Sequence, residues 1–413
     1  MALAPLVEEA LGGDIPVGVE AYDGSRAGPA DAATTLVIRS PDAVCRVLTA
    51  PGELGLARAY VAGDLDLRGS IWDLLALRDR LPGVRLSPRM LRRLVDELGG
   101  WRQVRRLPPP REEARLRGRR HSPQRDAAAI SHHYDVSNEF YRLVLGPSMT
   151  YSCAVFRHPD DSLEDAQANK YELICRKLGL EPGMRLLDVG CGWGGMVMHA
   201  ARHHGVRAVG VTLSRRQAEL AEKRVVEAGL SGQVEIRVQD YRDVDDGPYD
   251  AISSIGMFEH VGESRLATYF GRLRALLRPG GRLLNHGISR PPGSRSARLP
   301  RNSFINRYVF PDGELHEVGR VVSITQEAGF EVRHLESLRE HYALTLRRWV
   351  ANLEANWQQA VEEVGEGRAR VWRLYMAGSA VNFEAGRTQV HQVLSVPRTD
   401  DGVSGLPLRP VFE

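Results

Sequence analysis

The 413-residue chain is long enough for two or three domains, and its 43% hydrophobic and 26% charged residues are typical of a globular protein with a full core. The net charge of +3 excludes a protein that binds polyanions through charge alone, and no apolar run approaches the roughly 18 residues needed to span a bilayer. Four scattered cysteines argue against a disulfide framework or a zinc site, and the first residues lack the pattern of a secretory signal. We therefore expect a cytoplasmic protein.

Residues 1–100 alternate short apolar runs, at 35–39 and 45–48, with helical patterns at 54–62 and 71–81. This alternation indicates a small α+β domain. Residues 101–126 carry nine arginines and three consecutive prolines, a composition that cannot bury a core. We interpret them as a linker, which is either a solvated connector or a surface for anionic phospholipid head groups. Nucleic-acid binding is a weaker interpretation, because aromatic residues for base stacking are sparse there.

From about residue 127 onward, strand and helix patterns alternate regularly, which is typical of a mostly parallel sheet with helices on its faces. The last residues, 397–413, are expected to form a flexible tail. The predicted strands are 185–189, 208–212, 234–238, 250–255, 282–288, 331–338 and 389–394, and the helical patterns between and after them include 196–204, 342–364 and 368–385.

A glycine-rich turn follows the first of these strands directly. Glycines at such a turn let the backbone bend sharply and approach a ligand, and the helix that starts there offers free N–H groups. Dinucleotide sites also use such a turn, but they usually place an acid at the end of the second strand. Here the second strand ends in residues 210–214, Gly-Val-Thr-Leu-Ser, without a carboxylate. The spacing instead resembles that of S-adenosylmethionine methyltransferases, with Asp188 closing the first strand.

Longer motifs occur along the chain in a fixed order, and they are His132–Asn138, Met149–Ala154, Leu187–Gly195, Val211–Ser214, Ile255–Gly262 and Phe304–Pro311. On these motifs the chain resembles the cyclopropane-fatty-acyl-phospholipid synthase family, densely over about residues 120–395. The resemblance implies an α/β fold, with a seven-stranded class I (Rossmann-like) S-adenosylmethionine methyltransferase domain over residues 127–396. It also implies a smaller N-terminal α+β domain over residues 1–100, which is similar to a lipid carrier around Asp23–Ser25 and Gly28-Pro29.

The family transfers a methylene group from S-adenosylmethionine to the cis double bond of an unsaturated acyl chain in membrane phospholipids. The resemblance implies that the resulting carbocation loses a proton to bound bicarbonate and closes to a cyclopropane ring. Aromatic faces can stabilise such a cation, and Phe258, Tyr308, Phe310 and Trp349 are candidates for this role. An apolar pocket without water would protect it.

The resemblance also implies which residues hold bicarbonate. They are Cys153, Glu259, His286 and Tyr342, with the backbone around Gly256 and Ile288. The thiol, imidazole and phenol are donors that can hold a small oxyanion without a full countercharge. The glutamate is an acceptor for the hydroxyl group of the anion and makes its other oxygens more basic.

Cofactor contacts are likewise implied, while Asp188 is expected to order the turn and to touch the methionine amine through water. The contacts are Tyr134, Tyr151, Ser152, Gly190, Gly192, Thr212, Leu213, Gln217, Asp240, Tyr241 and Arg242. The expected cofactors are S-adenosylmethionine and bicarbonate, and no metal is expected.

The expected substrates are phospholipid acyl chains at the inner face of the membrane, because members that act on phospholipids carry an extra N-terminal domain as this chain does. That domain is expected to bind the bilayer, to aid homodimer formation, or both. One alternative product is a methylene-branched acyl chain, formed when the cation loses a different proton. A small-molecule N-methyltransferase and a lipid-binding protein with an inactive methyltransferase domain are also compatible with part of the motifs. Binding to nucleic acid is not expected.

Overall fold

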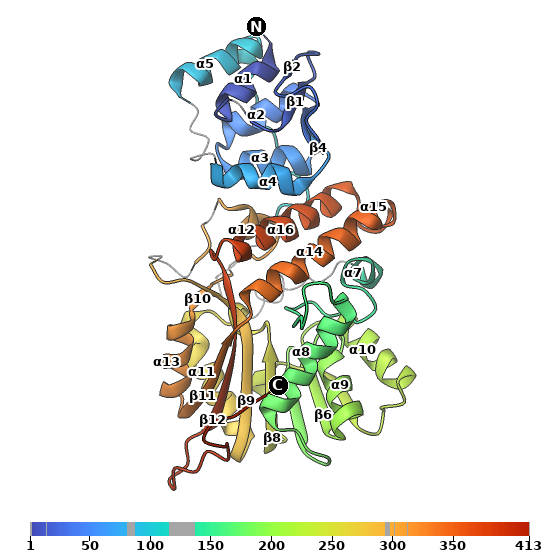
Figure 1. Ribbon diagram of the computed structural model, residues 1–413, viewed down its shortest axis with the longest axis vertical. Coiled ribbons are helices and arrows are strands. Elements are labelled where there is room, and N and C mark those ends of the chain that lie inside the picture. Colours follow the sequence, from blue (N-terminus) through green and yellow to red (C-terminus); the bar gives the residue numbers. More distant parts are fainter. Residues whose placement is uncertain are drawn as a thin grey trace. The chain divides into compact units, whose positions relative to one another are not determined.

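The computed structural model describes residues 2–13, 15–80, 87–114, 137–293, 298–300, 302–311 and 313–412 (Figure 1). The chain forms two compact units, each built from segments that are separate in the sequence. Unit 1 comprises Met1–Arg115, Pro300–Pro311 and Trp357–Gly378, and unit 2 comprises Leu116–Leu299, Asp312–Asn356 and Ser379–Glu413. No helix in the described parts of the chain is long and apolar enough to cross a membrane.

Unit 1 contains a four-stranded sheet in the order β2-β1-β3-β4, with β1 and β3 parallel and the other two pairs antiparallel. Apolar side chains from the sheet and from α1, α2 and α5 form its core. The strands are β1 Gly18–Ala21, β2 Arg26–Ala27, β3 Thr35–Ile38 and β4 Leu65–Arg68. The helices of residues 1–115 are α1 Leu3–Ala10, α2 Pro41–Thr49, α3 Glu53–Val61, α4 Ile71–Arg80, α5 Pro88–Glu97 and the one-turn η1 Trp101–Gln103.

The apolar run at 45–48 lies in helix α2. The prediction that this run is distinct from the helical patterns was therefore wrong. Pro41 occupies the first turn of α2, where a missing N–H costs nothing, and Ala43, Val44 and Cys45 are buried. Val44 and Leu48 are four residues apart and therefore lie on one side of the helix, both against the core. A short apolar run does not by itself distinguish a strand from a buried helical turn.

Unit 1 also includes segments from the second half of the chain, which the sequence analysis assigned to the methyltransferase domain. These are α12 Phe304–Tyr308, α15 Trp357–Val364 and the first part of α16 Glu366–Glu384. The buried carboxylate of Glu113 accepts hydrogen bonds from Arg58 Nε at 2.8 Å and from Arg307 Nε at 2.6 Å. Such pairing of buried charges between distant segments has no local pattern in the sequence, and for this reason the predicted boundaries at 100 and 126 differ from those of the compact unit.

Unit 2 is built on the seven-strand path β11-β12-β9-β8-β5-β6-β7, with the short β10 beside β9. All pairs on this path are parallel except those of β12, which runs antiparallel to both of its neighbours. The strands are β5 Arg185–Val189, β6 Arg207–Thr212, β7 Val234–Val238, β8 Tyr249–Ile255, β9 Leu277–Arg290, β10 His316–Glu317, β11 Phe330–Ser337 and β12 Gln389–Pro397. All seven predicted strands are therefore present, and β9 and β12 are longer than predicted.

Helices cover both faces of this sheet. Figure 1 shows α11 and α13 on one side and α8, α9 and α10 on the other. Neighbouring residues of β5 alternate between the two cores, with Leu187 packed towards the α11 side and Leu186 towards the α8 side. The helices are α7 Asn138–Leu145, α8 Leu163–Leu178, α9 Gly195–His204, α10 Arg215–Glu227, α11 Glu263–Leu276, α13 Val318–Glu327 and α14 Arg339–Ala355, with one-turn helices η2 Tyr241–Asp243 and η3 Phe258–His260.

The predicted helical segment 342–364 is two helices, because α14 ends at Ala355 and α15 begins at Trp357. Serine caps fix the starts of three other helices: the Ser137, Ser162 and Ser214 hydroxyls accept backbone N–H bonds at the beginnings of α7, α8 and α10. The start of α10 lies directly after β6. The cap therefore sets the direction in which the chain leaves the sheet beside the glycine turn.

Candidate active site

A cavity lies in unit 2 where β5, β6 and β8 reach their carboxyl ends. The turn that follows β5 forms one wall, and Gly190 and Gly192 adopt φ values of +83° and +54°, the left-handed region that favours glycine. Asp188 is buried behind the turn, where its Oδ1 accepts a hydrogen bond from the Ser253 hydroxyl at 2.7 Å. Burial raises the pKa of Asp188 to about 6. This position at the carboxyl edge of a parallel sheet is where such folds bind ligands.

Eleven of the twelve residues predicted to contact the cofactor line this cavity. The twelfth, Tyr134, lies outside the described residues. The eleven are Tyr151, Ser152, Asp188, Gly190, Gly192, Thr212, Leu213, Gln217, Asp240, Tyr241 and Arg242.

The side of the cavity at the end of β6 offers donors where a dinucleotide site would offer a carboxylate. The Thr212 hydroxyl donates to Gln217 Oε1 at 3.0 Å, so the amide NH₂ of Gln217 is the group left to donate. Asp240 is already occupied, because its Oδ1 accepts from the Arg242 backbone N–H at 2.9 Å and from Arg242 Nε at 2.8 Å. Burial opposes the effect, but these bonds hold the pKa of Asp240 below its usual value.

The wall of the cavity also contains a strained residue. Met149 has φ +54°, and among the described residues it is the one non-glycine residue with a positive φ. Such a conformation costs about 1–3 kcal/mol and persists only where the surroundings fix it. The Ser148 N–H donates to Glu164 at 2.9 Å, and the Thr150 and Tyr171 hydroxyls share a hydrogen bond of 2.7 Å. These bonds fix the segment that presents Tyr151 and Ser152 to the cavity.

A second group of predicted residues gathers behind the end of β8. The Ile288 N–H donates to Glu259 Oε1 at 2.6 Å, and the Gly256 N–H donates to the His286 carbonyl at 2.8 Å. The other carboxylate oxygen, Glu259 Oε2, is buried without a hydrogen-bond partner in the described part of the chain. Gly256 also lines the cofactor cavity, so the two groups of residues meet at this glycine.

A chain of buried hydrogen bonds orients His286. The Lys177 ammonium donates to Gln392 Oε1 at 2.7 Å and also forms an ion pair with Glu336. Since the lysine can only donate, the oxygen of Gln392 must face it, and the amide nitrogen then faces His286 Nδ1 at 3.2 Å. Nδ1 therefore accepts, and the ring proton resides on Nε2. That nitrogen is buried without a partner among the described residues.

Cys153 and Tyr342 meet at one backbone group. The Cys153 thiol lies 3.6 Å from the Leu338 carbonyl, which also accepts the Tyr342 N–H at 3.1 Å. The Leu338 N–H in turn donates to the Val390 carbonyl at 2.9 Å, and Val390 is the register partner of Ile288. These backbone links connect the segments that carry Cys153 and Tyr342 to strand β9, which carries His286 and Ile288. We call Cys153, Glu259, His286 and Tyr342 the base cluster.

Burial sets the charges of the base cluster. It raises the pKa of Glu259 to about 7, and it lowers the pKa of His286 to about 3, so the imidazole is neutral at physiological pH. Burial also raises the pKa of the Cys153 thiol well above its usual value. Around neutral pH the cluster therefore offers a thiol and an imidazole N–H as neutral donors and a carboxyl group poised between its two forms.

The candidate aromatic residues fall into both compact units. Trp349 packs against Tyr151 of the cavity, with ring centroids 5.3 Å apart, and against Tyr342 of the base cluster at 6.0 Å. Phe258 is buried in unit 2. Tyr308 and Phe310 belong to unit 1, and none of the four candidates lines the cofactor cavity itself. The Tyr308 hydroxyl bonds to the buried carboxylate of unit 1 at 3.3 Å, which gives this residue a structural role.

Three polar residues near the site were missed in the sequence analysis. Lys170 lines the cofactor cavity, and Lys177 and Gln392 orient His286. The composition did contain a signal, because only three of the 55 basic residues are lysine. Two of these three are fully buried in α8. A buried ammonium needs hydrogen-bond partners or a ligand. Two lysines in one short segment of a chain that otherwise uses arginine therefore indicate a polar site at α8.

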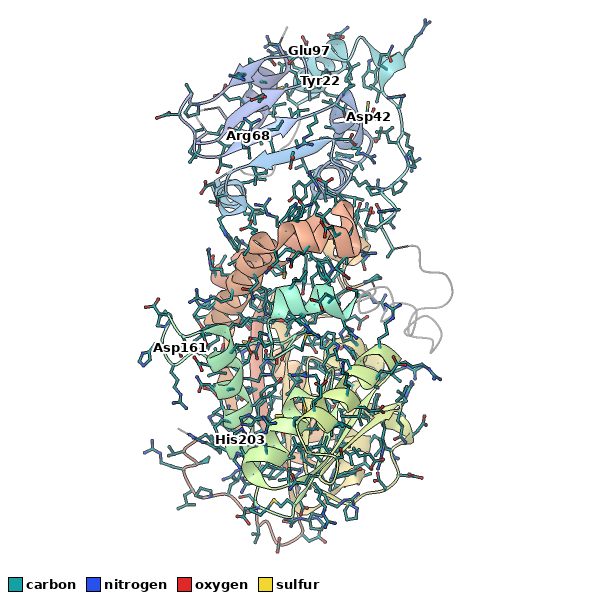
Figure 2. All side chains as sticks on the ribbon, turned by 90° about the vertical axis from the view of Figure 1, so that its right-hand side faces the viewer. Tyr22, Asp42, Arg68, Glu97, Asp161 and His203 are labelled. Carbon is teal, nitrogen blue, oxygen red and sulfur yellow. The ribbon has the colours of Figure 1, made fainter. Side chains whose placement is uncertain are left out.

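The structure also brings Cys175, His199 and His204 together, with ligand atoms within 4.8 Å of one another. Glu172 accounts for both histidines, since its Oε2 lies 3.0 Å from His204 Nε2 and 3.5 Å from His199 Nε2. His203, labelled in Figure 2, packs on His199 with centroids 4.5 Å apart. Glu172 thus partners both histidines of this group.

Comparison with known families decides between the possible uses of this cavity. Residues 121–393 match the family model described as mycolic acid cyclopropane synthetase, which is more than half of the chain. The chain belongs to this family. It is accordingly an S-adenosylmethionine-dependent methyltransferase of the cyclopropane synthase type, as the motifs predicted.

Relatives of this family match nearly the whole chain. A probable fatty acid methyltransferase of Mycobacterium tuberculosis is 51% identical, covering 97% of this chain and 96% of that protein. The cyclopropane-fatty-acyl-phospholipid synthase of Escherichia coli is 34% identical over 92% of this chain and 93% of its own length. The tuberculostearic acid methyltransferase UfaA1 of M. tuberculosis is also 34% identical, over 92% of this chain and 87% of its own.

A solved structure supports the fold and the cofactor. The crystal structure of the mycolic acid cyclopropane synthase CmaA1 complexed with SAH and CTAB matches with a TM-score of 0.61 and 36% identity. The match covers 65% of this chain and 98% of that chain. The predicted methyltransferase fold is confirmed, and S-adenosylmethionine is the cofactor of the family. The likeness of residues 1–100 to a lipid carrier stays a prediction.

Proposed function

We propose that this enzyme transfers a methylene group from S-adenosylmethionine to the cis double bond of an unsaturated acyl chain in membrane phospholipids, giving a cyclopropane ring. The observation that carries the proposal concerns two buried atoms of the base cluster that have no hydrogen-bond partner in the part of the chain that the structure describes. Glu259 Oε2 is an acceptor and His286 Nε2 carries a proton to donate. A small polar ligand with one donor and several acceptors would satisfy both atoms.

Bicarbonate fits this pair chemically. It has a hydroxyl group to donate to Glu259 and oxygen atoms to accept from His286 Nε2 and, once the S–H turns away from the Ala154 and Leu338 carbonyls, from the Cys153 thiol. When bound, S-adenosylmethionine supplies an electrophilic methyl group and bicarbonate supplies a base for the last proton. Because His286 is neutral, its Nε2–H can donate to the anion without adding a charge to the site. Glu259 is the acceptor for the hydroxyl group of the anion.

The other residues of the site position the reactants and exclude water. The cavity wall at Tyr151 and Ser152 holds the methyl donor beside Gly256, which joins the cavity to the base cluster. A weakly nucleophilic alkene reacts only when it is held in line with the departing sulfur, so orientation supplies much of the rate. Trp349, packed between Tyr151 and Tyr342, offers an aromatic face that excludes water and attracts a developing cation.

Unit 1 supports the membrane part of the proposal. Trp101 is 64% exposed, and the arginines at 102, 105 and 106 beside it are exposed as well. Exposed tryptophan is favoured at membrane interfaces, and each arginine near an anionic leaflet contributes about 1 kcal/mol. We propose that this segment contacts anionic phospholipids at the inner face of the membrane. The homodimer stays a prediction.

A methylene-branched acyl chain is the second candidate product. Relatives whose names describe fatty acid and tuberculostearic acid methyltransferases favour it, while the phospholipid synthase of E. coli favours the ring. Both products share the methyl transfer and differ in which proton leaves the cation. A small-molecule N-methyltransferase has no such support among these relatives.

Mass spectrometry can test the proposal directly. The full-length protein is incubated with S-adenosylmethionine and vesicles of an oleoyl phospholipid, and the lipids are then fragmented. We expect a gain of one CH₂ per reacted chain, with the ring at the former double bond. Stripping bicarbonate from the buffer should lower the rate and adding it back should restore the rate. A phospholipid of unchanged mass would contradict the proposal, and a branched fragment pattern would support the second product.

Glu259→Gln is the matched variant. We expect it to lose most activity while binding S-adenosylhomocysteine as the parent protein does, because the side chain belongs to the base cluster and does not line the cofactor cavity. Calorimetry that shows lost cofactor affinity, together with full activity, would contradict this assignment.

A further inference from the structure

Lys170 is a fully buried cation at the wall of the cofactor cavity. Its ammonium donates to the Ser152 hydroxyl at 3.1 Å and lies 3.8 Å from the centroid of the Tyr171 ring. Among the described residues no carboxylate oxygen lies within 4.0 Å of it, the limit for an ion pair. A buried ammonium without an anionic partner is costly, so its presence requires an explanation.

The position of Lys170 connects two parts of the site. It lines the cofactor cavity, whereas no side chain of the base cluster does so. The Ser152 hydroxyl that accepts its hydrogen bond lines the same cavity, and Ser152 directly precedes Cys153 of the base cluster in the chain. Lys170 is therefore located at the junction between the methyl donor and the base.

The buried carboxylate of Asp188 does not form an ion pair with Lys170. Asp188 is more distant than an ion-pair contact, and its Oδ1 already accepts from Ser253. Burial raises the pKa of Asp188 and lowers that of Lys170 to about 7, so neither group holds the other firmly in its charged form. A bound anion would supply the missing charge.

The geometry limits which anion can bind. An ammonium has three N–H groups; one is directed to Ser152 and the cation faces the Tyr171 ring, so few donors remain for a ligand. A small, singly charged oxyanion suits this arrangement. Two such groups occur in the proposed reaction, namely bicarbonate and the methionine carboxylate of the cofactor.

We propose that Lys170 is the cationic element of an oxyanion subsite at the junction of the cofactor cavity and the base cluster, which binds either bicarbonate or the carboxylate of the cofactor. This inference rests on the proposed function. It changes the expectation that neutral donors hold the anion without a countercharge.

Carbon-13 labelling of the lysine ε-carbons tests the subsite in the parent protein. The chain has only three lysines, so three signals are expected, and Lys177→Met and Lys223→Met variants assign them. Bicarbonate and S-adenosylhomocysteine are then added separately. We expect one of them to raise the pKa of Lys170 by at least one unit, because a bound anion favours the ammonium. An unchanged Lys170 signal with both ligands overturns the proposal.

A variant identifies the source of the oxyanion. Lys170→Met removes the charge, and Lys170→Gln retains donors if the first variant fails to fold. For a bicarbonate subsite we expect the half-saturating bicarbonate concentration to rise at least tenfold with the Kd of S-adenosylhomocysteine unchanged. For a subsite that binds the carboxylate of the cofactor, we expect the Kd of S-adenosylhomocysteine to rise at least tenfold. Decarboxylated S-adenosylmethionine should then bind the parent protein and the variant equally.

Lys223→Met is the matched control, since this lysine is exposed on α10 and pairs only with Glu227 among the described residues. It should change none of these constants. Unchanged constants in the Lys170 variants as well overturn the proposal. A parent protein that does not methylate phospholipid would contradict the proposed function instead, and the labelling and binding measurements would still decide whether the subsite exists.

Discussion

At the scale of single residues, the base cluster combines buried atoms that the fold leaves unsatisfied. Glu259 Oε1 accepts a backbone hydrogen bond from Ile288, and the second oxygen has no partner in the described part of the chain. His286 is held from one side through Gln392 and Lys177. Such groups destabilise the free protein and are useful only when a ligand satisfies them, so their cost should be measurable.

The carboxyl group of Glu259 should make the fold less stable as the pH rises. Its folded pKa of about 7 exceeds the usual 4.5, so the folded state holds the proton more tightly. Stability is therefore fully present below about pH 4.5 and is lost as the pH rises through 7, by on the order of 3 kcal/mol. Glu259→Gln should remove this loss. Urea unfolding of both proteins at pH 5 and pH 8 measures this loss of stability. Equal changes in the free energy of unfolding of the two proteins would contradict the raised pKa of Glu259.

Gln392 should determine the tautomer of His286. In the parent protein we expect nitrogen-15 shifts of an Nε2–H imidazole, because Nδ1 accepts from Gln392. Gln392→Leu should give mixed tautomers and lower the activity by about tenfold to a hundredfold, the range for outer partners of histidine ligands. The exposed Gln358→Leu serves as control. A purely structural Gln392 would change the melting temperature and leave the tautomer unaltered.

At the scale of elements, the close packing of β9 against η3 positions Glu259. A Cβ on Gly287 would lie 1.9 Å from the Phe258 ring, so the strand can approach η3 only with glycine there. Phe258 and Glu259 are neighbours in η3, and both are buried. The backbone of β9 therefore supplies the Ile288 N–H to Glu259 and leaves room for the ring that fixes η3.

Gly287→Ala should disturb this arrangement. We expect a loss of about 1–3 kcal/mol from overpacking against Phe258, and a loss of activity because η3 must shift. Gly271→Ala on α11 is the matched control, since nothing lies within 4 Å of its Cβ and alanine should stabilise the helix by about 0.5–1 kcal/mol. Denaturant unfolding and methyl-transfer assays measure both. A neutral Gly287→Ala would mean that η3 adapts without cost.

At the scale of the whole molecule, unit 1 depends on segments far apart in the chain. Glu113 pairs with Arg58 and Arg307, and its side chain is only 1% exposed. Arg370 similarly pairs with Asp66 at 3.1 Å. Deleting the N-terminal hundred residues would thus remove Arg58 from Glu113 and Asp66 from Arg370. The compact unit has to be studied as a whole.

Glu113→Gln should destabilise unit 1 by about 3 kcal/mol at pH 7, the lower end for breaking a buried pair, because Arg307 is partly exposed. Burial acts in the opposite direction, but the two arginines hold the pKa of Glu113 below its usual value. Its stabilisation is therefore present above pH 4.5 and is lost as the pH falls through the folded pKa. Thermal unfolding should show a difference that narrows in acid. The exposed pair of Glu9 and Arg93 is the control, and Glu9→Gln should cost under about 1 kcal/mol.

Much of the fold and of the cofactor site could be predicted from the sequence, because these features are local. Alternating strands and helices, the glycine turn at 190–194 and the carboxylate at Asp188 each produce a pattern within a few residues. Parallel strands then bring their carboxyl ends to one edge, so residues after β5, β6 and β8 had to meet. The family resemblance placed Cys153, Glu259, His286 and Tyr342 together without showing how they are held.

Only the tertiary structure shows which partners the buried charged side chains have. Lys170 and Lys177 lie seven residues apart on α8, and nothing local shows that one faces the cofactor cavity while the other reaches Gln392. The membership of residues 300–311 and 357–378 in unit 1 was equally invisible, because buried ion pairs join residues that are hundreds of positions apart. Local patterns determine elements and turns, whereas the partner of a buried charge depends on the packing of the whole chain.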